Sequence, residues 1–338
     1  MSRRTPIIAI TIGDPSGVGP EIAVKALAER RREVPADGQF AAMLVGDMRV
    51  IERARTLFAP GLATREIDEP REAAASDHVY VFDVPSEQVD VDNPVSSQGT
   101  AAAGTAAYDA LQAATQLALA GEVDAVVTAP LNKEALSLAG HLGVGHTELL
   151  ADFCGVARAE VAMMLASDRL KIAHVSTHVP LRTAIETLST ERIVTVGRLA
   201  GAAVARSIGR QPVIAVAGVN PHAGEAGLFG REDLDIIQPA VRALVEEGWN
   251  ATGPVAPDTV FARAVAGAFD VVIAMYHDQG HIPAKLIGFH DTVNVTLGLP
   301  IVRVSVDHGT AYDIAWQGQA DAANMAVAVG VAVRMMED

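Results

Sequence analysis

The chain contains one cysteine and no long apolar run, and each shortage excludes a class of protein. Cys154 stands alone among 338 residues, so no internal disulfide can form, and a reducing, cytoplasmic setting is expected. No uninterrupted apolar stretch approaches the roughly 20 residues needed to cross a bilayer. The N-terminal apolar run is broken by Gly13, Asp14 and Pro15, and no small-residue cleavage site follows it. It therefore predicts a first strand, and we expect no membrane partner.

Positive charge is also scarce. The chain has 26 Lys and Arg against 41 Asp and Glu, for a net charge of −15 and a pI near 5.0. The basic residues form only short clusters, "RRT" and "ERRR", near the N-terminus. Nucleic acid is therefore excluded as a partner, and an anionic substrate would need its own local Arg, Lys or helix N-terminus.

Apolar strand-like runs alternate with segments of helical period, which predicts an α/β architecture with a largely parallel sheet. A chain of this length, half of it hydrophobic, favours two lobes. One helix is predicted over 100–120 with Gly121 as its C-terminal cap, and another begins after an N-cap at Ser189 and ends near Gly209. Residues 60–98 show a weak pattern, for which we expect loops and edge strands.

Three histidines each follow a run that predicts a buried strand: His178, His222 and His277. In an open α/β sheet, ligands bind at this edge. Three neutral imidazoles can hold one divalent ion and leave positions open for a substrate, and Asp278 could orient one of them. The alternative is that loop hydrogen bonds satisfy each ring, which is favoured for any one of them alone. Their repeated context favours the metal site.

A Gly-rich turn precedes a helix near the N-terminus, in "GDPSGVGPE". Gly17 and Gly19 match the first two glycines of a dinucleotide-binding fingerprint, but Ile22 occupies the third position. The turn is either an anion site or simply a tight turn, and the residues do not favour one over the other.

Further candidates for anion binding lie elsewhere in the chain. His146 and Thr147 stand at the start of a predicted helix, where a phosphate or carboxylate could bind, although a cap formed by Thr147 is slightly favoured. Lys285 and Arg303 have side chains that bind phosphate or carboxylate, and Asn294 can orient a hydroxyl or carbonyl. Each would be ordinary on a surface, but Arg303 interrupts an apolar strand.

These motifs together resemble the 4-hydroxythreonine-4-phosphate dehydrogenase family, from about Ile7 to the C-terminus. The resemblance implies a two-lobed α/β/α sandwich of the isocitrate and isopropylmalate dehydrogenase-like type, with the active site in the cleft between the lobes. It implies a first lobe over 1–130 plus 300–338 and a central lobe over 131–299 that carries the metal ligands and the interface of a homodimer. The motifs that carry it are "GDPSGVGPE", "APLNKEAL", "GHTELL", "STHVPLR", "NPHAGE", "PDTVF", "YHDQGHIPAK" and "VDHGTAYDIA".

The resemblance also implies roles for particular residues. The metal ligands would be His178, His222 and His277, one of them from the partner chain, around a zinc, cobalt, magnesium or manganese ion. The substrate-binding residues would be His146, Thr147, Lys285, Asn294 and Arg303. The residues that bind NAD, or NADP, would be Asp307, His308, Gly309, Thr310 and Asp313. The catalytic candidates for proton transfer are Lys285 and Asp258.

The implied reaction is oxidation of the C3 hydroxyl of a 4-phosphorylated four-carbon hydroxy acid, followed by decarboxylation of the β-keto acid. Three features favour the branch that acts on 4-phospho-D-threonate or 4-phospho-D-erythronate: "AGLFGRED" in place of a Gly-Gly-His stretch, His281, and Trp316 in place of a small residue. The alternative is 4-phosphohydroxy-L-threonine dehydrogenase of pyridoxal 5'-phosphate biosynthesis. A metal-dependent phosphate-ester hydrolase or a phosphate-binding protein is a remote alternative.

Overall fold

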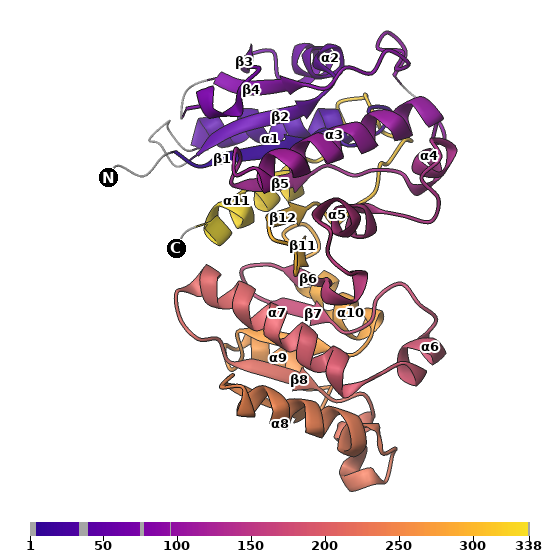
Figure 1. Ribbon diagram of the computed structural model, residues 1–338, viewed down its shortest axis with the longest axis vertical. Coiled ribbons are helices and arrows are strands. Elements are labelled where there is room, and N and C mark those ends of the chain that lie inside the picture. The colour runs from indigo at the N-terminus through magenta and orange to yellow at the C-terminus, as the bar shows by residue number, and fades with distance from the viewer. Residues whose placement is uncertain (1–4, 34–39, 75–77, 95, 337–338) are drawn as a thin grey trace. The chain divides into compact units, whose positions relative to one another are not determined.

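Figure 1 shows the computed structural model of the chain, which describes residues 5–33, 40–74, 78–94 and 96–336. The described residues divide into two compact units. Unit 1 comprises Met1–Arg158 and Leu299–Met336, so both ends of the chain contribute to it, and unit 2 comprises Ala159–Gly298. Residues 131–158, which the sequence assigns to the central lobe, pack with unit 1.

Unit 1 is built on a parallel sheet. Its strands, in spatial order, are β3 (Ala63–Glu66), β4 (His78–Asp83), β2 (Ala41–Gly46), β1 (Ile7–Thr11), β5 (Ala125–Thr128) and β12 (Val302–Ser305). Every described pairing among them is parallel. β1 and β5 are buried along their whole length, as expected where helices cover both faces of a sheet.

Two groups of helices pack around this sheet. The helices of unit 1 are α1 (Gly19–Glu33), α2 (Met48–Phe58), α3 (Ala101–Leu119), α4 (Lys133–Leu138), α5 (His146–Cys154) and α11 (Ala323–Met336), with a short turn η1 (Pro70–Glu72). α1 packs against α2 and α11, whereas α3 packs against α4 and α5. The predicted start of α3 is confirmed, because the Thr100 hydroxyl accepts a hydrogen bond from the Ala103 amide at 3.2 Å. Gly121 follows the helix with φ +70°.

The expectation of loops and edge strands over residues 60–98 is only partly correct. β3 lies at the edge of the sheet, but β4 lies inside it, paired with β2 on one side and β3 on the other. Val79, Tyr80 and Val81 of β4 are buried. The buried part of this strand is short and polar segments flank it, so its apolar signal is weak in the sequence.

Unit 2 has a mixed sheet. Its strands, in spatial order, are β11 (Val293–Leu297), β6 (Ala162–Ala166), β7 (Lys171–His174), β10 (Val271–Ala274), β8 (Ile214–Ala217) and β9 (Ala251–Val255). β6 is antiparallel to both β11 and β7, and the remaining pairs are parallel. The turn of residues 167–170 between β6 and β7 is too short for a parallel crossover, so these strands must run in opposite directions.

The helices of unit 2 are α6 (Leu181–Glu186), α7 (Thr190–Ile208), α8 (Gln238–Glu246), α9 (Val260–Val265) and α10 (His277–Ile287), with a π-helical turn η4 (Asp233–Ile237) before α8. The predicted cap of α7 is confirmed: the Ser189 hydroxyl accepts from the Arg192 amide at 3.2 Å, and Gly209 ends the helix with φ +66°. Among the described helices, none combines the length and apolar character needed to span a membrane.

Candidate active site

The predicted site residues form two groups, one in each unit, beyond the carboxyl ends of parallel strands. In unit 1 they lie in the segments that follow β5 and β12, whose neighbour β1 ends in the Gly-rich turn. In unit 2, the three histidines follow β7, β8 and β10, which are also neighbours. Because adjacent parallel strands end at the same edge, each unit gathers its group at one edge of its own sheet.

Arg303 lies in the middle of β12 and is the largest fully buried side chain of the structure, with 2% of its surface exposed. Its Nη2 donates to the Thr128 hydroxyl, at the end of β5, over 2.6 Å. Burial lowers the pKa of the guanidinium to about 9, so it remains charged at neutral pH. A buried cation is costly unless an anion approaches it, and the position is therefore suited to a phosphate or carboxylate.

The N-terminus of α5 lies in the electrostatic field of Arg303. Burial lowers the pKa of His146 well below its usual range, and the positive charges of Arg303 and Lys133 lower it further. The imidazole is thus neutral at pH 7 and can donate or accept one hydrogen bond. The helix N-terminus adds unpaired amides, so cationic groups and hydrogen-bond donors face one region.

Thr147 does not cap this helix, contrary to the sequence interpretation. The N-cap is Gly145, whose amide donates to the Glu148 carboxylate at 2.8 Å, and Thr147 lies inside the first turn. A side chain at Gly145 would come within 2.9 Å of Cε of Lys133, so the glycine allows the lysine to approach closely. Lys133 is a charged neighbour that the sequence places only within the "APLNKEAL" motif.

The Gly-rich turn of residues 13–19 is a tight, buried turn that supports the predicted nucleotide loop. A Cβ atom at Gly17 would lie 2.9 Å from Thr310, and one at Gly19 would meet the Ile12 carbonyl at 2.1 Å. The Val18 amide donates to the Thr310 carbonyl at 2.9 Å. Of the two interpretations that the sequence leaves open, the geometry favours the tight turn.

The predicted nucleotide loop has a tied inner side and an open outer side. Thr310 is buried, Asp307 donates its amide to Asn324 Oδ1 at 2.9 Å, and His308, Gly309 and Asp313 are exposed. The space around the Cα of Gly309 is open. A fixed loop that presents a carboxylate and free backbone surface outward can accept ribose hydroxyls and the edge of a base, so these residues fit a nucleotide.

In unit 2, His178 and His277 come close together. Their ring centroids are 5.6 Å apart, with His178 exposed and His277 half-buried. Nδ1 of His277 pairs with the Asp278 carboxylate at 2.6 Å, as expected for a carboxylate that orients a ligand. A cavity of about 570 Å³ opens here, and it is lined by Thr177, His178, Val179, Pro180, Leu181, Ala184, Tyr276, His277 and Asp278.

Two further histidines extend this cluster. The ring of His281 stacks on His277 at 3.6 Å and 9°, and His174 lies 4.7 Å from His281. His174 is fully buried in β7, and within the described residues neither of its ring nitrogens has a hydrogen-bond partner. Burial, together with the neighbouring histidines, lowers its pKa to about 3. Gly280 makes this contact possible, because a side chain there would meet Nε2 of His174.

His222 lies in a separate loop with unusual backbone geometry. Residues 222–226 all have positive φ, between 43° and 80°, although only Gly224 tolerates this freely. The buried carboxylate of Asp233 holds the segment before it by accepting from the amides of Val219 at 2.9 Å and Asn220 at 3.1 Å. His222 itself is exposed.

The residues of one chain do not complete a three-histidine metal site. Over 5–33, 40–74, 78–94 and 96–336, no group of three or more His, Cys, Asp or Glu side chains is arranged to hold a metal ion. His178 and His277 form a pair, and His222 lies in another loop. The metal site thus stays a prediction that requires a ligand in addition to this pair.

The remaining predicted residues also lie in unit 2. Asn294, in β11, has a buried Oδ1 without a hydrogen-bond partner among the described residues, so it can accept a donor from a ligand. Lys285, in α10, is half-buried, with Nζ 5.4 Å from the Phe289 ring centroid. Asp258 is exposed in the loop between β9 and α9.

Comparisons with known proteins match nearly the whole chain. Residues 39–332 match the model of the family described as pyridoxal phosphate biosynthetic protein PdxA. The chain is 47% identical to D-threonate 4-phosphate dehydrogenase of Pectobacterium atrosepticum, over 97% of this chain and 99% of that protein. It is 44% identical to 4-hydroxythreonine-4-phosphate dehydrogenase of Geobacter metallireducens, over 99% of this chain and 97% of that protein.

A solved structure gives the same result. The crystal structure of 4-hydroxythreonine-4-phosphate dehydrogenase from Klebsiella pneumoniae is 46% identical and superposes with a TM-score of 0.88, covering 98% of this chain and 99% of that one. At this identity and coverage, the similarity extends over both units and all the motifs named above.

Proposed function

The chain belongs to the family of the pyridoxal phosphate biosynthetic protein PdxA, and on that premise we propose that it oxidises the C3 hydroxyl of a 4-phosphorylated four-carbon hydroxy acid with NAD or NADP. It is an oxidoreductase, and it has the α/β fold of the isocitrate and isopropylmalate dehydrogenase type that this family shares. The relatives named above are all dehydrogenases, so the hydrolase alternative receives no support from them.

The observation that carries the proposal is the buried cation beside the N-terminus of α5. Arg303 is 2% exposed yet charged at neutral pH, and His146 is kept neutral beside it. We assign the phosphate or carboxylate of the substrate to Arg303, with His146 and Thr147 as hydrogen-bonding groups. Lys285 and Asn294 would contact the other polar end, and the unsatisfied Oδ1 of Asn294 supports that role.

The reaction needs a hydride acceptor and a base. The C3–H bond breaks as hydride moves to the nicotinamide, which is the chemistry that the cofactor supplies when bound. The hydroxyl proton passes to Lys285 or Asp258 as general base. The product is a β-keto acid, and loss of CO2 from 3-oxo-4-phosphothreonate leaves dihydroxyacetone phosphate. The nucleotide would lie on the outer side of the loop that contains His308, Gly309 and Asp313.

We further propose a homodimer that shares its metal sites. His178, His222 and His277 would hold one zinc, cobalt, magnesium or manganese ion per site, with one histidine from the partner, because a single chain supplies only a close pair. When bound, the ion would lower the pKa of the substrate hydroxyl. The single cysteine is consistent with a cytoplasmic setting.

A mixing experiment tests the shared site. Inactive His178→Ala, His222→Ala and His277→Ala proteins are mixed in pairs under conditions of proven subunit exchange. Two variants whose ligands come from different chains restore up to about a quarter of the activity, because half the dimers are hybrids and one of their two sites is intact. The pair that stays inactive identifies the two histidines that share a chain. No recovery in any mixture would contradict the shared site.

We assign the substrate to 4-phospho-D-threonate or 4-phospho-D-erythronate, with 4-phosphohydroxy-L-threonine as the alternative. Both relatives named from these branches match at similar identity, 47% and 44%, so identity does not separate them. The features that favour the threonate branch are His281, which stacks on His277, and Trp316, whose Nε1 donates to the Pro15 carbonyl at 3.0 Å.

The test is NADH formation with 4-phospho-D-threonate, 4-phospho-D-erythronate and 4-phosphohydroxy-L-threonine, each with and without EDTA. We expect the highest kcat/KM with one of the two phosphorylated sugar acids and loss of activity with the chelator. Faster oxidation of the amino acid would place the enzyme in pyridoxal phosphate synthesis. No reduction of NAD or NADP with any of the three would contradict the proposal.

A further inference from the structure

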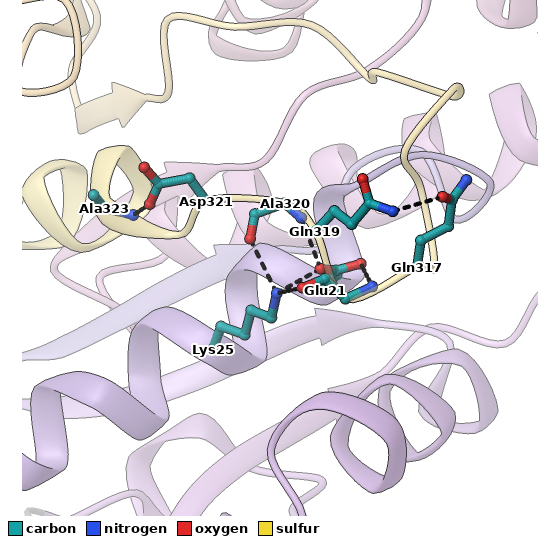
Figure 2. A network of polar contacts seen from close by, with 8 residues as sticks. Glu21, Lys25, Gln317, Gln319, Ala320, Asp321 and Ala323 are labelled. Atoms are coloured by element: carbon teal, nitrogen blue, oxygen red, sulfur yellow. Dashed lines mark hydrogen bonds and ion pairs between the residues drawn. The ribbon is translucent and has the colours of Figure 1, made fainter.

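A buried carboxylate and a lysine on α1 hold the segment that follows the predicted nucleotide loop (Figure 2). Glu21 is fully buried and accepts from the amides of Gly318 at 3.2 Å and Ala320 at 3.0 Å. Lys25, one turn further along α1, donates to the carbonyls of the same two residues at 2.8 and 3.0 Å. The two side chains also pair with each other at 2.6 Å. Together they bind both the amide and the carbonyl of each loop residue.

The preceding part of the loop is tied to the Gly-rich turn. The Tyr312 hydroxyl donates to the Asp14 carboxylate at 2.7 Å, and Trp316 donates to the Pro15 carbonyl. These contacts come from the inner side of the loop, and Figure 2 shows the side chains of Gln317 and Gln319 beside the held segment. Both glutamines are exposed.

The backbone between these contacts adopts a conformation that needs external support. Ala311 has φ +42° and Trp316 has φ +61°, in the left-handed region that is unfavourable for residues with a Cβ atom. A loop in such a conformation relaxes unless its ends are held. Glu21 and Lys25 hold the end that lies furthest along the chain, almost 300 residues from α1 in sequence.

We propose that Glu21 and Lys25 are positioning residues for the nucleotide cofactor, because they fix the shape of the loop before the cofactor arrives. This inference rests on the proposed function, since it takes residues 307–313 as the loop that binds the nucleotide. A preorganised loop binds without having to be ordered first, so the pair contributes to affinity for the dinucleotide and not to the chemical step. Neither side chain touches the cofactor in this account.

The experiment compares Glu21→Gln and Lys25→Met with Glu29→Gln, which removes an exposed carboxylate from the same helix. Glu21→Gln places an amide group against one of the donors that the carboxylate now accepts from. In the cofactor-free protein, we expect hydrogen exchange at the Gly318 and Ala320 amides to accelerate at least tenfold in both test variants. Calorimetry should show about tenfold weaker NAD binding, with kcat at saturating NAD and KM for the phosphorylated substrate both within twofold of the parent values. The control should match the parent protein in every measurement.

Three results would overturn the inference. One is unchanged NAD affinity despite faster exchange at the two amides. Another is an equal rise in the NAD dissociation constant and the substrate KM, which indicates general loss of structure. The third is a Lys25→Met protein that folds and binds NAD as the parent does, a variant that remains informative if Glu21→Gln does not fold. A parent protein that binds neither NAD nor NADP refutes the proposed function itself, and the parent alone shows this.

Discussion

Unit 1 buries its ligand-binding groups, whereas unit 2 exposes them. Arg303 is 2% exposed and His146 is half-buried, both at the edge of a fully parallel sheet. His178 and His222 are exposed, and His277 is half-buried. Burial fixes the geometry of a charged group and removes water from it, so the anion site of unit 1 is formed by one chain. The histidines of unit 2 lack such enclosure, which is the condition expected of a site completed by another molecule.

The same contrast is visible in how each unit fixes its loop. Both use a fully buried carboxylate that accepts backbone amides, Glu21 in unit 1 and Asp233 in unit 2. Glu21 acts on residues almost 300 positions away, and its loop has two non-glycine residues with positive φ. Asp233 acts on residues 13 and 14 positions away, beside an uninterrupted left-handed stretch over 222–226. Unit 2 thus stores more backbone strain in a more local structure.

The largest effect is expected from removing the buried cation. Arg303→Met keeps an apolar side chain of similar length, so the fold should persist. Loss of a buried charge partner for a phosphate or carboxylate costs about 3 to 4 kcal/mol, which lowers kcat/KM by a few hundredfold to a thousandfold. Arg158→Met is the control, because Arg158 forms only an exposed pair with Asp152. Steady-state kinetics with the phosphorylated substrate measure the effect. A variant within tenfold of the parent would show that unit 1 does not bind the anion at Arg303.

The exposed histidine of unit 2 should separate activity from stability. His222→Ala removes a predicted metal ligand and should lower activity at least about 100-fold, together with the metal content. The side chain is exposed, so the free energy of unfolding should change by less than about 0.5 kcal/mol. His290→Ala, also at an exposed position of unit 2, is the control. Unchanged metal content and activity in His222→Ala would refute its role as a ligand.

A smaller effect, on stability, should follow from Asp233→Ala. The substitution leaves the amides of Val219 and Asn220 without their acceptor, at a cost of about 3 kcal/mol in the free energy of unfolding. Asp235→Ala is the matched control, because Asp235 makes only an exposed pair with Arg231 and should change stability by less than about 0.5 kcal/mol. Urea unfolding measures both variants. Equal stability of the two variants would remove the parallel with Glu21.

The pH dependence of stability should show the burial of His146. Its pKa is lowered in the folded protein, so the unfolded chain binds the proton first as the pH falls. The contribution of His146 is therefore complete above about pH 6.5 and is lost as the pH falls toward the folded-state pKa, with a slope of at most about 1.4 kcal/mol per pH unit. His146→Gln should flatten the curve of unfolding free energy against pH below 6.5. An identical curve for parent and variant would show that the ring titrates normally.

The sequence predicted much of this arrangement because the signals were local. The caps at Thr100 and Ser189 are confirmed, and the histidines do follow strand ends, since a parallel strand and the loop after it are adjacent in sequence. Arg303 in an apolar strand indicated a buried charge, and 2% exposure confirms it.

What the sequence missed depends on packing between distant segments. Glu21 looks like an ordinary acidic residue in the first turn of a helix, and nothing nearby indicates that it binds residues 318 and 320. His174 becomes unusual only through the approach of Gly280 from α10. Thr147 was predicted as the cap because its side chain is a good one, but the extended backbone at Gly145 starts the helix two residues earlier.

The central claim is that one chain forms the anion site of unit 1 without the metal of unit 2. Calorimetric titration of 4-phospho-D-threonate into EDTA-treated protein tests it most directly, with Arg303→Met and unphosphorylated D-threonate as references. We predict saturable binding of the phosphorylated acid to the metal-free parent protein, and at least about 100-fold weaker binding in both references. Binding of the phosphorylated acid that appears only when the metal is restored would contradict the account.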